Sequence, residues 1–170
     1  MDAFSGQHRL VYKAHTSPIN DGSWSPDFTR IATASADSTV RIWDAATGET
    51  LLTHTFDSNV FGAAWSPDAK FIAAGAEHDQ LQNLDTTSNT IGLAYSGNGY
   101  PVFRAGWSPT GTHIAGTAER LYVWDAHTGK ILFSMPGGTT TFGWSPDGTR
   151  IASVADRPQP VGAAIVWLTS

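Results

Sequence analysis

The residues best suited by type to chemistry are Glu77, His78 and Asp79, three consecutive potential metal ligands. Carboxylates and imidazoles bind divalent cations, but neighbouring residues of a strand or turn point in different directions and do not converge on one ion. We therefore expect this run to form a turn between two strands and not a metal centre. The chain has no cysteine, which excludes disulfides, thiolate metal sites and cysteine nucleophiles.

No other segment has the spacing of a known catalytic motif. The patterns Gly-x-Ser-x-Gly, His-Glu-x-x-His and the P-loop are all absent. The run Gly97-Asn98-Gly99 lacks both a third glycine and a following helix, so it is expected to be a turn. The sequence therefore predicts a protein that is not an enzyme and that uses no cofactor and no metal.

Charge and length restrict the class of protein further. Ten basic and fifteen acidic residues in a chain of 170 give a formal charge of −5, which provides no footprint for nucleic acid or for an anionic membrane. No apolar run approaches the roughly 18 residues of a membrane-spanning helix. Residues 1–10 lack the basic and then apolar pattern of a signal peptide, which favours a cytoplasmic location.

The composition favours short strands joined by tight turns. The chain has 15 Ser, 20 Thr and 17 Gly but only 3 Glu and 3 Lys, so strong helix formers are scarce and turn residues are abundant. Aromatic residues make up 11% of the chain. This mixture is typical of an all-β protein and not of a helix bundle or an alternating βαβ protein.

An internal repeat gives the organisation of these strands. The tripeptide Trp-Ser-Pro occurs four times, at spacings of 41, 42 and 37 residues, and a second mark of the Trp-Asp type follows each copy. All seven tryptophans fall on these two positions, so we expect none to line a ligand pocket of its own. The tripeptides begin at Trp24, Trp65, Trp107 and Trp144, and the second marks are Trp43-Asp44, Leu84-Asp85, Trp124-Asp125 and Trp167-Leu168.

Each repeat is predicted to contain four strands. In the first repeat these are residues 19–24, 30–35, 39–43 and 50–56, separated by turns rich in Pro, Asp and Gly. A period near 40 residues with four strands in each unit indicates a propeller blade. The acidic residues in the turns are better explained by turn chemistry than by catalysis.

The segment from Trp24 to Asp44 closely resembles the WD40 family, particularly its bacterial members rich in Trp-Ser-Pro-Asp-Gly, and the resemblance extends over about residues 10–167. It implies an all-β propeller of four-stranded blades. Residues 1–170 would form one half-propeller with four blades, at about 16–56, 57–97, 98–136 and 137–170. The last blade would be completed by an N-terminal strand, residues 9–14, of the same chain or of a partner chain.

The resemblance also implies a hydrogen-bond network within a blade, which in this chain only the first repeat can supply in full. Its members would be His15, Ser35 (or Thr33), Asp37 and Trp43. A network of this kind stiffens the blade by pairing buried polar groups, and it shares only its composition with a Ser-His-Asp catalytic triad. Later repeats depart from the pattern, with Leu84 in place of Trp, Leu168 in place of Asp and an insertion at 157–161.

Four blades are about half of a WD40 ring, which leaves several assemblies open. Two copies could form an eight-bladed homodimer by strand exchange, which is the assembly that we favour, because it would pair the exposed strand edges symmetrically. The chain could instead close as a four-bladed monomer, be a truncated piece of a longer protein, or be completed by a different chain.

We expect a protein-interaction scaffold that binds itself and another protein or peptide, with no role in binding nucleic acid or membranes. The contact loops would be 16–20, 57–59, 97–100 and 137–139, and the candidate partner-binding residues are Asn20, Asn59, Tyr100 and Arg104. Arg104 is the only full charge next to the small residues of the inner strands. Two alternatives remain: a sugar-binding propeller using Tyr95 and Tyr100, and an architectural or engineered fragment without a ligand.

Overall fold

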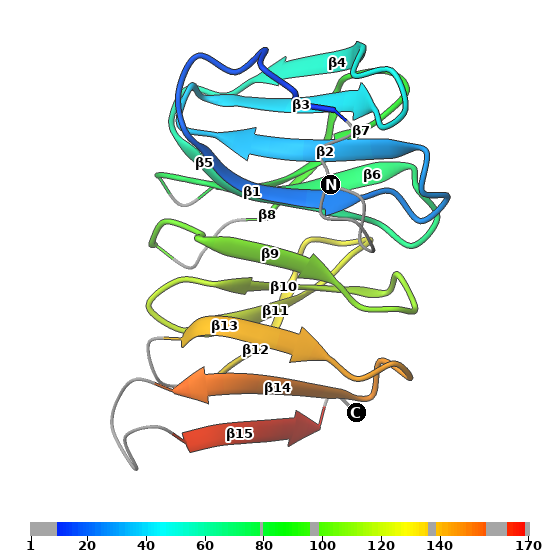
Figure 1. The fold of residues 1–170 in the computed structure, drawn as a ribbon. Coiled ribbons are helices and arrows are strands. Elements are labelled where there is room, and N and C mark those ends of the chain that lie inside the picture. Colours follow the sequence, from blue (N-terminus) through cyan, green and yellow to red (C-terminus); the bar gives the residue numbers. More distant parts are fainter. Residues whose placement is uncertain (1–9, 79, 96–98, 136–138, 156–162, 169–170) are drawn as a thin grey trace.

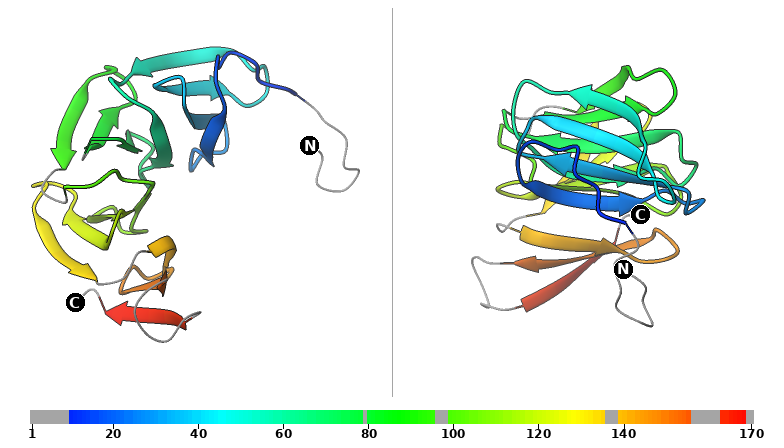
Figure 2. Two further views of the ribbon diagram at one scale, coloured as in Figure 1. Left: turned by 90° about the vertical axis from the view of Figure 1, so that its left-hand side faces the viewer. Right: turned by 45° about the horizontal axis from the view of Figure 1, so that its top comes forward.

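In the computed structural model the chain consists of strands and turns across the residues that the structure describes, which are 10–78, 80–95, 99–135, 139–155 and 163–168. These residues form four antiparallel sheets, which follow one another around an open arc (Figures 1 and 2). The expected all-β fold is confirmed. None of the described ranges contains a helix that could cross a membrane.

Each sheet is a meander, because its strands lie side by side in chain order. The first sheet contains β1 (Ile19–Trp24), β2 (Arg30–Ser35), β3 (Thr39–Asp44) and β4 (Thr50–Thr55), and the second contains β5 (Val60–Trp65), β6 (Phe71–Ala76), β7 (Gln80–Asp85) and β8 (Ile91–Tyr95). The third contains β9 (Arg104–Trp107), β10 (His113–Thr117), β11 (Leu121–Asp125) and β12 (Ile131–Met135), and the fourth contains β13 (Thr139–Trp144), β14 (Arg150–Ala155) and β15 (Ala163–Leu168).

The Trp-Ser-Pro motif forms the turn between the first two strands of every sheet. In each copy the serine hydroxyl accepts a hydrogen bond from the backbone N–H five residues later, at 2.9–3.1 Å. In three copies the same hydroxyl also donates to the aspartate that follows the proline. These bonds lower the pKa of both Asp27 and Asp147 to about 2. The motif therefore closes the hairpin, and its acids serve the turn, as the sequence predicted.

A second repeated turn joins the third and fourth strands. Asp44, Asp85 and Asp125 each accept hydrogen bonds from the backbone N–H groups two and three residues later, at 2.8–3.0 Å. Those bonds hold the pKa of each carboxyl below its ordinary value. The aspartate of the Trp-Asp mark is thus a turn residue, which explains why it recurs.

The core lies between neighbouring sheets and not within one. We call the surface of a sheet that meets the following sheet its C-terminal face. Between the first two sheets, Ala32, Ala34, Val40 and Ile42 pack against the second sheet and are at most 1% exposed. Small residues allow close approach: a Cβ on Gly75 would lie 2.5 Å from the carbonyl oxygen of Val102.

The N-terminal segment is predicted to complete the fourth sheet of the same chain or of a partner chain, and within one chain it does not do so. Residues 10–14 are not paired with any sheet, and Arg9 lies outside the described residues. Among the described residues the fourth sheet therefore has three strands, and none of them pairs with the outer edge of β15. The arc is open, with its two ends apart in Figure 2, so the structure is not the closed four-bladed monomer. The insertion at 157–161 also lies outside the described residues.

Candidate functional site

The side chains of His15, Asp37 and Thr33 form a buried hydrogen-bonded chain on the first sheet. His15 Nδ1 lies 2.9 Å from Asp37 Oδ2, and His15 Nε2 lies 2.8 Å from Thr33 Oγ1. The side chains of His15 and Asp37 are only 3% and 5% exposed. The imidazole thus ties the segment before β1 to β2 and to the turn after it.

Asp37 collects several further donors. Its carboxylate accepts hydrogen bonds from the Thr39 hydroxyl at 2.6 Å and from the backbone N–H of Thr16 at 3.0 Å. Burial acts to raise the pKa of Asp37, but the bonds from Thr39, Thr16 and His15 outweigh burial and hold the pKa well below its ordinary value. The carboxylate is therefore ionised, and its hydrogen bonds hold the first sheet together.

The other two residues expected in this network form no hydrogen bond with His15 in the described part of the chain. Ser35 donates its hydroxyl to the carbonyl oxygens of Ser17 and Pro18, so Thr33 is the residue that meets the imidazole. Trp43 Nε1 has no hydrogen-bond partner among the described residues. The Trp43 ring instead stacks on Tyr12, with centroids 4.6 Å apart and planes 5° apart. Trp43 belongs to an aromatic contact and not to the polar chain.

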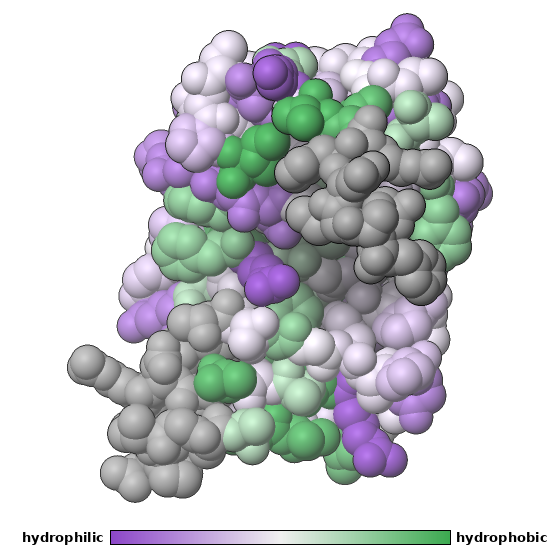
Figure 3. Space-filling view, viewed as in Figure 1, coloured by the Kyte–Doolittle hydropathy of each residue, from purple (hydrophilic) through white to green (hydrophobic). Residues whose placement is uncertain are grey.

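Three of the four candidate partner-binding residues come together at one end of the inner strands. Asn20 Nδ2 donates to Asn59 Oδ1 at 2.9 Å and to the carbonyl oxygen of Val60 at 2.8 Å. Asn20 and Arg104 line one cavity of about 280 Å³, together with Asp21, Phe61 and Phe103. Hydrophobic and hydrophilic residues are mixed on this concave side of the arc, which β1, β5, β9 and β13 present to the viewer in Figure 3.

Arg104 is the cationic group of this cavity. It is exposed at the start of β9, and it forms no ion pair with the residues that the structure describes. Beside it the rings of Phe61 and Phe103 lie 5.1 Å apart, and Phe103 is 53% exposed. An exposed guanidinium next to exposed aromatic carbon can bind a carboxylate that carries apolar surface.

The two tyrosines considered for sugar stacking behave differently. Tyr95 is fully buried and donates its hydroxyl to the carbonyl oxygen of Ala126, and burial raises its pKa to about 12. Tyr95 therefore cannot stack on a sugar. Tyr100 is 45% exposed, and the neighbouring Glu119 raises its pKa. Residues 97, 98, 137 and 138 of the expected contact loops lie outside the described residues.

The end faces of the arc expose residues whose equivalents are buried inside it. In the first sheet Ala32 pairs with Ile42 and Ala34 with Val40, and in the fourth Ala152 pairs with Val166 and Val154 with Ala164. The first set is covered by the second sheet, whereas Val154 and Val166 are 36% and 62% exposed. At the other end Ile19 and Trp24 are 47% and 55% exposed, against 0% and 7% for their equivalents Val60 and Trp65.

Sequence reasoning missed a second cavity, between the second and third sheets. Its volume is about 450 Å³, and Trp107 is among its lining residues. Trp107 thus keeps its place in the repeat and also lines this cavity. One signal was available: Asn83 is a polar residue at a position where other repeats have Ile42 and Val123.

The run Glu77-His78 lies in the turn between β6 and β7, and Asp79 lies outside the described residues. His78 has a φ of 59°, typical of a tight turn. In the described part of the chain no three His, Cys, Asp or Glu side chains are grouped as a metal site would require.

Four-stranded meander sheets placed face to face around an arc define this chain as part of a β-propeller. A family model described as "WD domain, G-beta repeat" matches residues 6–44 and 48–81. The WD repeat-containing protein AAC3 of Dictyostelium discoideum is 32% identical over 106 residues, 62% of this chain. The mouse F-box-like/WD repeat-containing protein TBL1X is 31% identical over 143 residues, 74% of this chain.

The chain belongs to the WD40 repeat family. It spans 22% of the length of AAC3 and 27% of the length of TBL1X. Proteins with WD repeats act as protein-interaction scaffolds.

Proposed function

We propose that this chain is a non-enzymatic WD40 protein-interaction unit that self-associates: the end faces of two copies bind each other and close a ring of eight sheets. The observation that carries this proposal is the position of residues 10–12 on the first sheet. They occupy the place that a fourth strand of a preceding sheet would occupy.

The third sheet supplies the template for that position. There Leu93 and Tyr95 of β8, which belongs to the preceding sheet, reach across to Gly129 and Trp124. A Cβ on Gly129 would lie 3.3 Å from Leu93, and the rings of Tyr95 and Trp124 are 6.3 Å apart.

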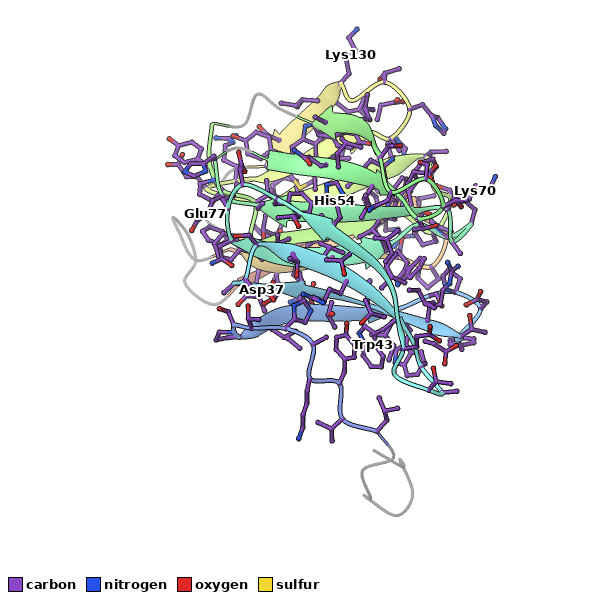
Figure 4. The ribbon with its side chains drawn as sticks, turned by 90° about the horizontal axis from the view of Figure 1, so that it is seen from above. Asp37, Trp43, His54, Lys70, Glu77 and Lys130 are labelled. Carbon is purple, nitrogen blue, oxygen red and sulfur yellow. The ribbon has the colours of Figure 1, made fainter. Side chains whose placement is uncertain are left out.

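The first sheet repeats this arrangement with the N-terminal segment. A Cβ on Gly48 would lie 3.0 Å from Leu10, and the Tyr12 ring stacks on Trp43. The spacings within the chain agree as well, because Leu10 and Tyr12 are two residues apart like Leu93 and Tyr95. Figure 4 shows the segment leaving the first sheet beside Trp43. Residues 10–12 therefore dock as the outer strand of a missing sheet.

The fourth sheet of a second copy supplies what is missing. Its described part has three strands, with no strand paired to the outer edge of β15, and an unpaired edge favours the addition of a strand. In the proposed dimer, residues 9–14 of one copy pair with β15 of the other, and the two-fold symmetry creates two identical seams.

The side chains at this seam would repeat those of an internal seam. Inside the chain, Trp65 Nε1 donates to the carbonyl oxygen of Ser23 at 3.2 Å, and the guanidinium of Arg30 lies 4.6 Å from the centre of the Trp65 ring. The fourth sheet has Arg150 at the position of Arg30, and Trp24 of the second copy would take the place of Trp65. The apolar side chains of Val154 and Val166 would be buried beneath it.

The cavity at Asn20, Phe103 and Arg104 would serve a different partner. Its unpaired cation and exposed ring favour a protein segment that carries a carboxylate next to an apolar side chain. The Trp-Ser-Pro repeats further support placing the chain with the bacterial members of its family.

The dimer is tested by measuring solution mass with light scattering. We expect twice the chain mass of 18.1 kDa for the unmodified chain, and a single chain mass for Val166→Lys and for deletion of residues 1–14. The matched control is Leu132→Ser, because Leu132 is 47% exposed on β12, away from both end faces. An unmodified chain that stays at 18.1 kDa at high concentration, or a dimer that survives Val166→Lys, would overturn the proposal.

A further inference from the structure

The cavity between the second and third sheets is separate from the surfaces described above. β9 begins at Arg104, in the first cavity, and ends at Trp107, which lines this second one. The walls are mostly apolar and include Phe71, Leu93 and Ala126, while exposed polar residues such as Asp68 and His127 stand at the mouth. Its volume of about 450 Å³ falls in the range of small-ligand pockets.

Asn83 is the unusual residue of this cavity. It pairs with Ala73 in β6, and the same register position holds Ile42, Val123 and Val166 in the other three sheets. A buried amide thus replaces a branched aliphatic side chain on a face that is otherwise apolar. Packing alone would favour the aliphatic residue, so the amide calls for another explanation.

The oxygen of this amide has no partner. Asn83 is 5% exposed, and its Oδ1 forms no hydrogen bond within the described part of the chain. Asn83 lies close enough to Tyr95 to lower the pKa of its hydroxyl, against the larger effect of burial, which raises that pKa. The Asn83 oxygen is left as an acceptor that lacks a donor, which is costly in a buried position.

The walls indicate the shape of the missing donor. The rings of Phe71 and Trp107 are nearly parallel, with planes 23° apart and centroids separated by 6.4 Å. Aromatic walls of this kind favour a planar aromatic group. The terminal torsion of an asparagine is soft, so a small rotation can turn the oxygen toward a ligand. The Asp68 carboxylate at the mouth disfavours an anionic ligand.

We propose that this cavity binds a phenol group, an aromatic ring whose hydroxyl donates to Asn83 Oδ1. The group could belong to a free small molecule or to a tyrosine side chain of a partner protein. The site lies within one chain and does not depend on the proposed dimer.

The test compares two ligands of the same shape, p-cresol and toluene, by NMR titration of the isotope-labelled chain. We expect shifts of the Asn83 side-chain amide and the Trp107 indole resonances, and binding of p-cresol about tenfold tighter than binding of toluene, because only p-cresol can supply the donor. Equal binding of the two ligands, or no binding of either, would overturn the proposal.

The variant Asn83→Ile separates a binding role from a structural one. Isoleucine stands at the equivalent position 42, so the variant is expected to fold. The proposal predicts that the variant has a higher melting temperature than the unmodified chain, because a buried polar group is replaced by an apolar one. It also predicts that p-cresol and toluene bind the variant about equally. A lower melting temperature would show that the Asn83 amide serves the fold itself, and would contradict the proposal.

A third ligand identifies the source of the phenol group. A blocked tripeptide with a central tyrosine should bind more tightly than p-cresol if the group belongs to a partner protein. If the natural ligand is a free phenol, p-cresol should bind and the tripeptide should not. Either result supports the site.

Discussion

The first and fourth sheets carry the same kind of C-terminal face but differ in whether it is covered. Val40 and Ile42 are at most 1% exposed beneath the second sheet, whereas Val166, at the register position of Ile42, is 62% exposed. The residue types and the strand register are alike, so the difference lies only in the presence of a following sheet. The apolar face of a WD40 sheet is therefore buried only when a neighbouring sheet packs on it.

The largest expected effect comes from substituting the same tryptophan at a covered and at an open position. Trp65→Ala should lower the free energy of unfolding by about 3–5 kcal/mol, because the ring is 7% exposed and fills the seam between two sheets. Trp24→Ala should cost below about 1 kcal/mol in the monomer, because its ring is 55% exposed. Denaturant unfolding, at a concentration where the chain is monomeric, measures both.

Comparable losses for the two variants would show that Trp24 is already covered within one chain. That outcome would contradict the comparison on which the dimer rests.

A smaller effect is expected at the polar chain of the first sheet. Asp37→Asn should lower the free energy of unfolding near neutral pH by about 1–3 kcal/mol, because His15 and Thr16 lose a charged acceptor.

The pH dependence of this difference follows from the lowered pKa of Asp37. Its stabilising contribution is complete above the ordinary carboxyl pKa of 3.8 and is lost as the pH falls through the lower folded value. The gap in stability between the unmodified chain and Asp37→Asn should therefore shrink below pH 3.8. A gap that is constant down to acid pH would assign the loss to shape and not to charge.

The smallest effect concerns the Trp-Ser-Pro turns of the first and fourth sheets. Phe28 and Gly148 occupy equivalent turn positions with φ of 60° and 72°, and Phe28 is 75% exposed. Phe28→Gly should raise the free energy of unfolding by about 0.5 kcal/mol, because relief of backbone strain at this position exceeds the entropy cost of glycine. Denaturant unfolding measures the change. Gly148→Ala should lower stability by about 1 kcal/mol. Changes of the opposite sign would show that the turns are not equivalent.

The architecture was predictable because it depends on local and repeated signals. The hydrogen bonds of the Trp-Ser-Pro turns and of the aspartates in the Trp-Asp marks span at most five residues. The spacing of these motifs alone therefore locates each hairpin. The grouping of Asn20 with Asn59 and Arg104 was also within reach, because equivalent strand ends gather at one end of a propeller.

The remaining features depend on contacts between sheets, which the repeat pattern does not determine. The docking of Tyr12 on Trp43 needs the position of the segment before β1, and the pattern gave only its strand-like composition. The second cavity needs both the missing branched side chain at Asn83 and the ring of Trp107 from the next sheet. In the sequence, the cavity is indicated only by the polar residue Asn83 at a position where the other repeats have apolar residues.

The docking of residues 10–12 on the first sheet has a consequence for linking two copies of the chain. In the proposed dimer, each copy lends one strand to the fourth sheet of the other. If two copies were joined in tandem, residues 9–14 of the second would follow β15 of the first, at the edge where no described strand is paired. The contact between two molecules would then become an ordinary hairpin within one polypeptide.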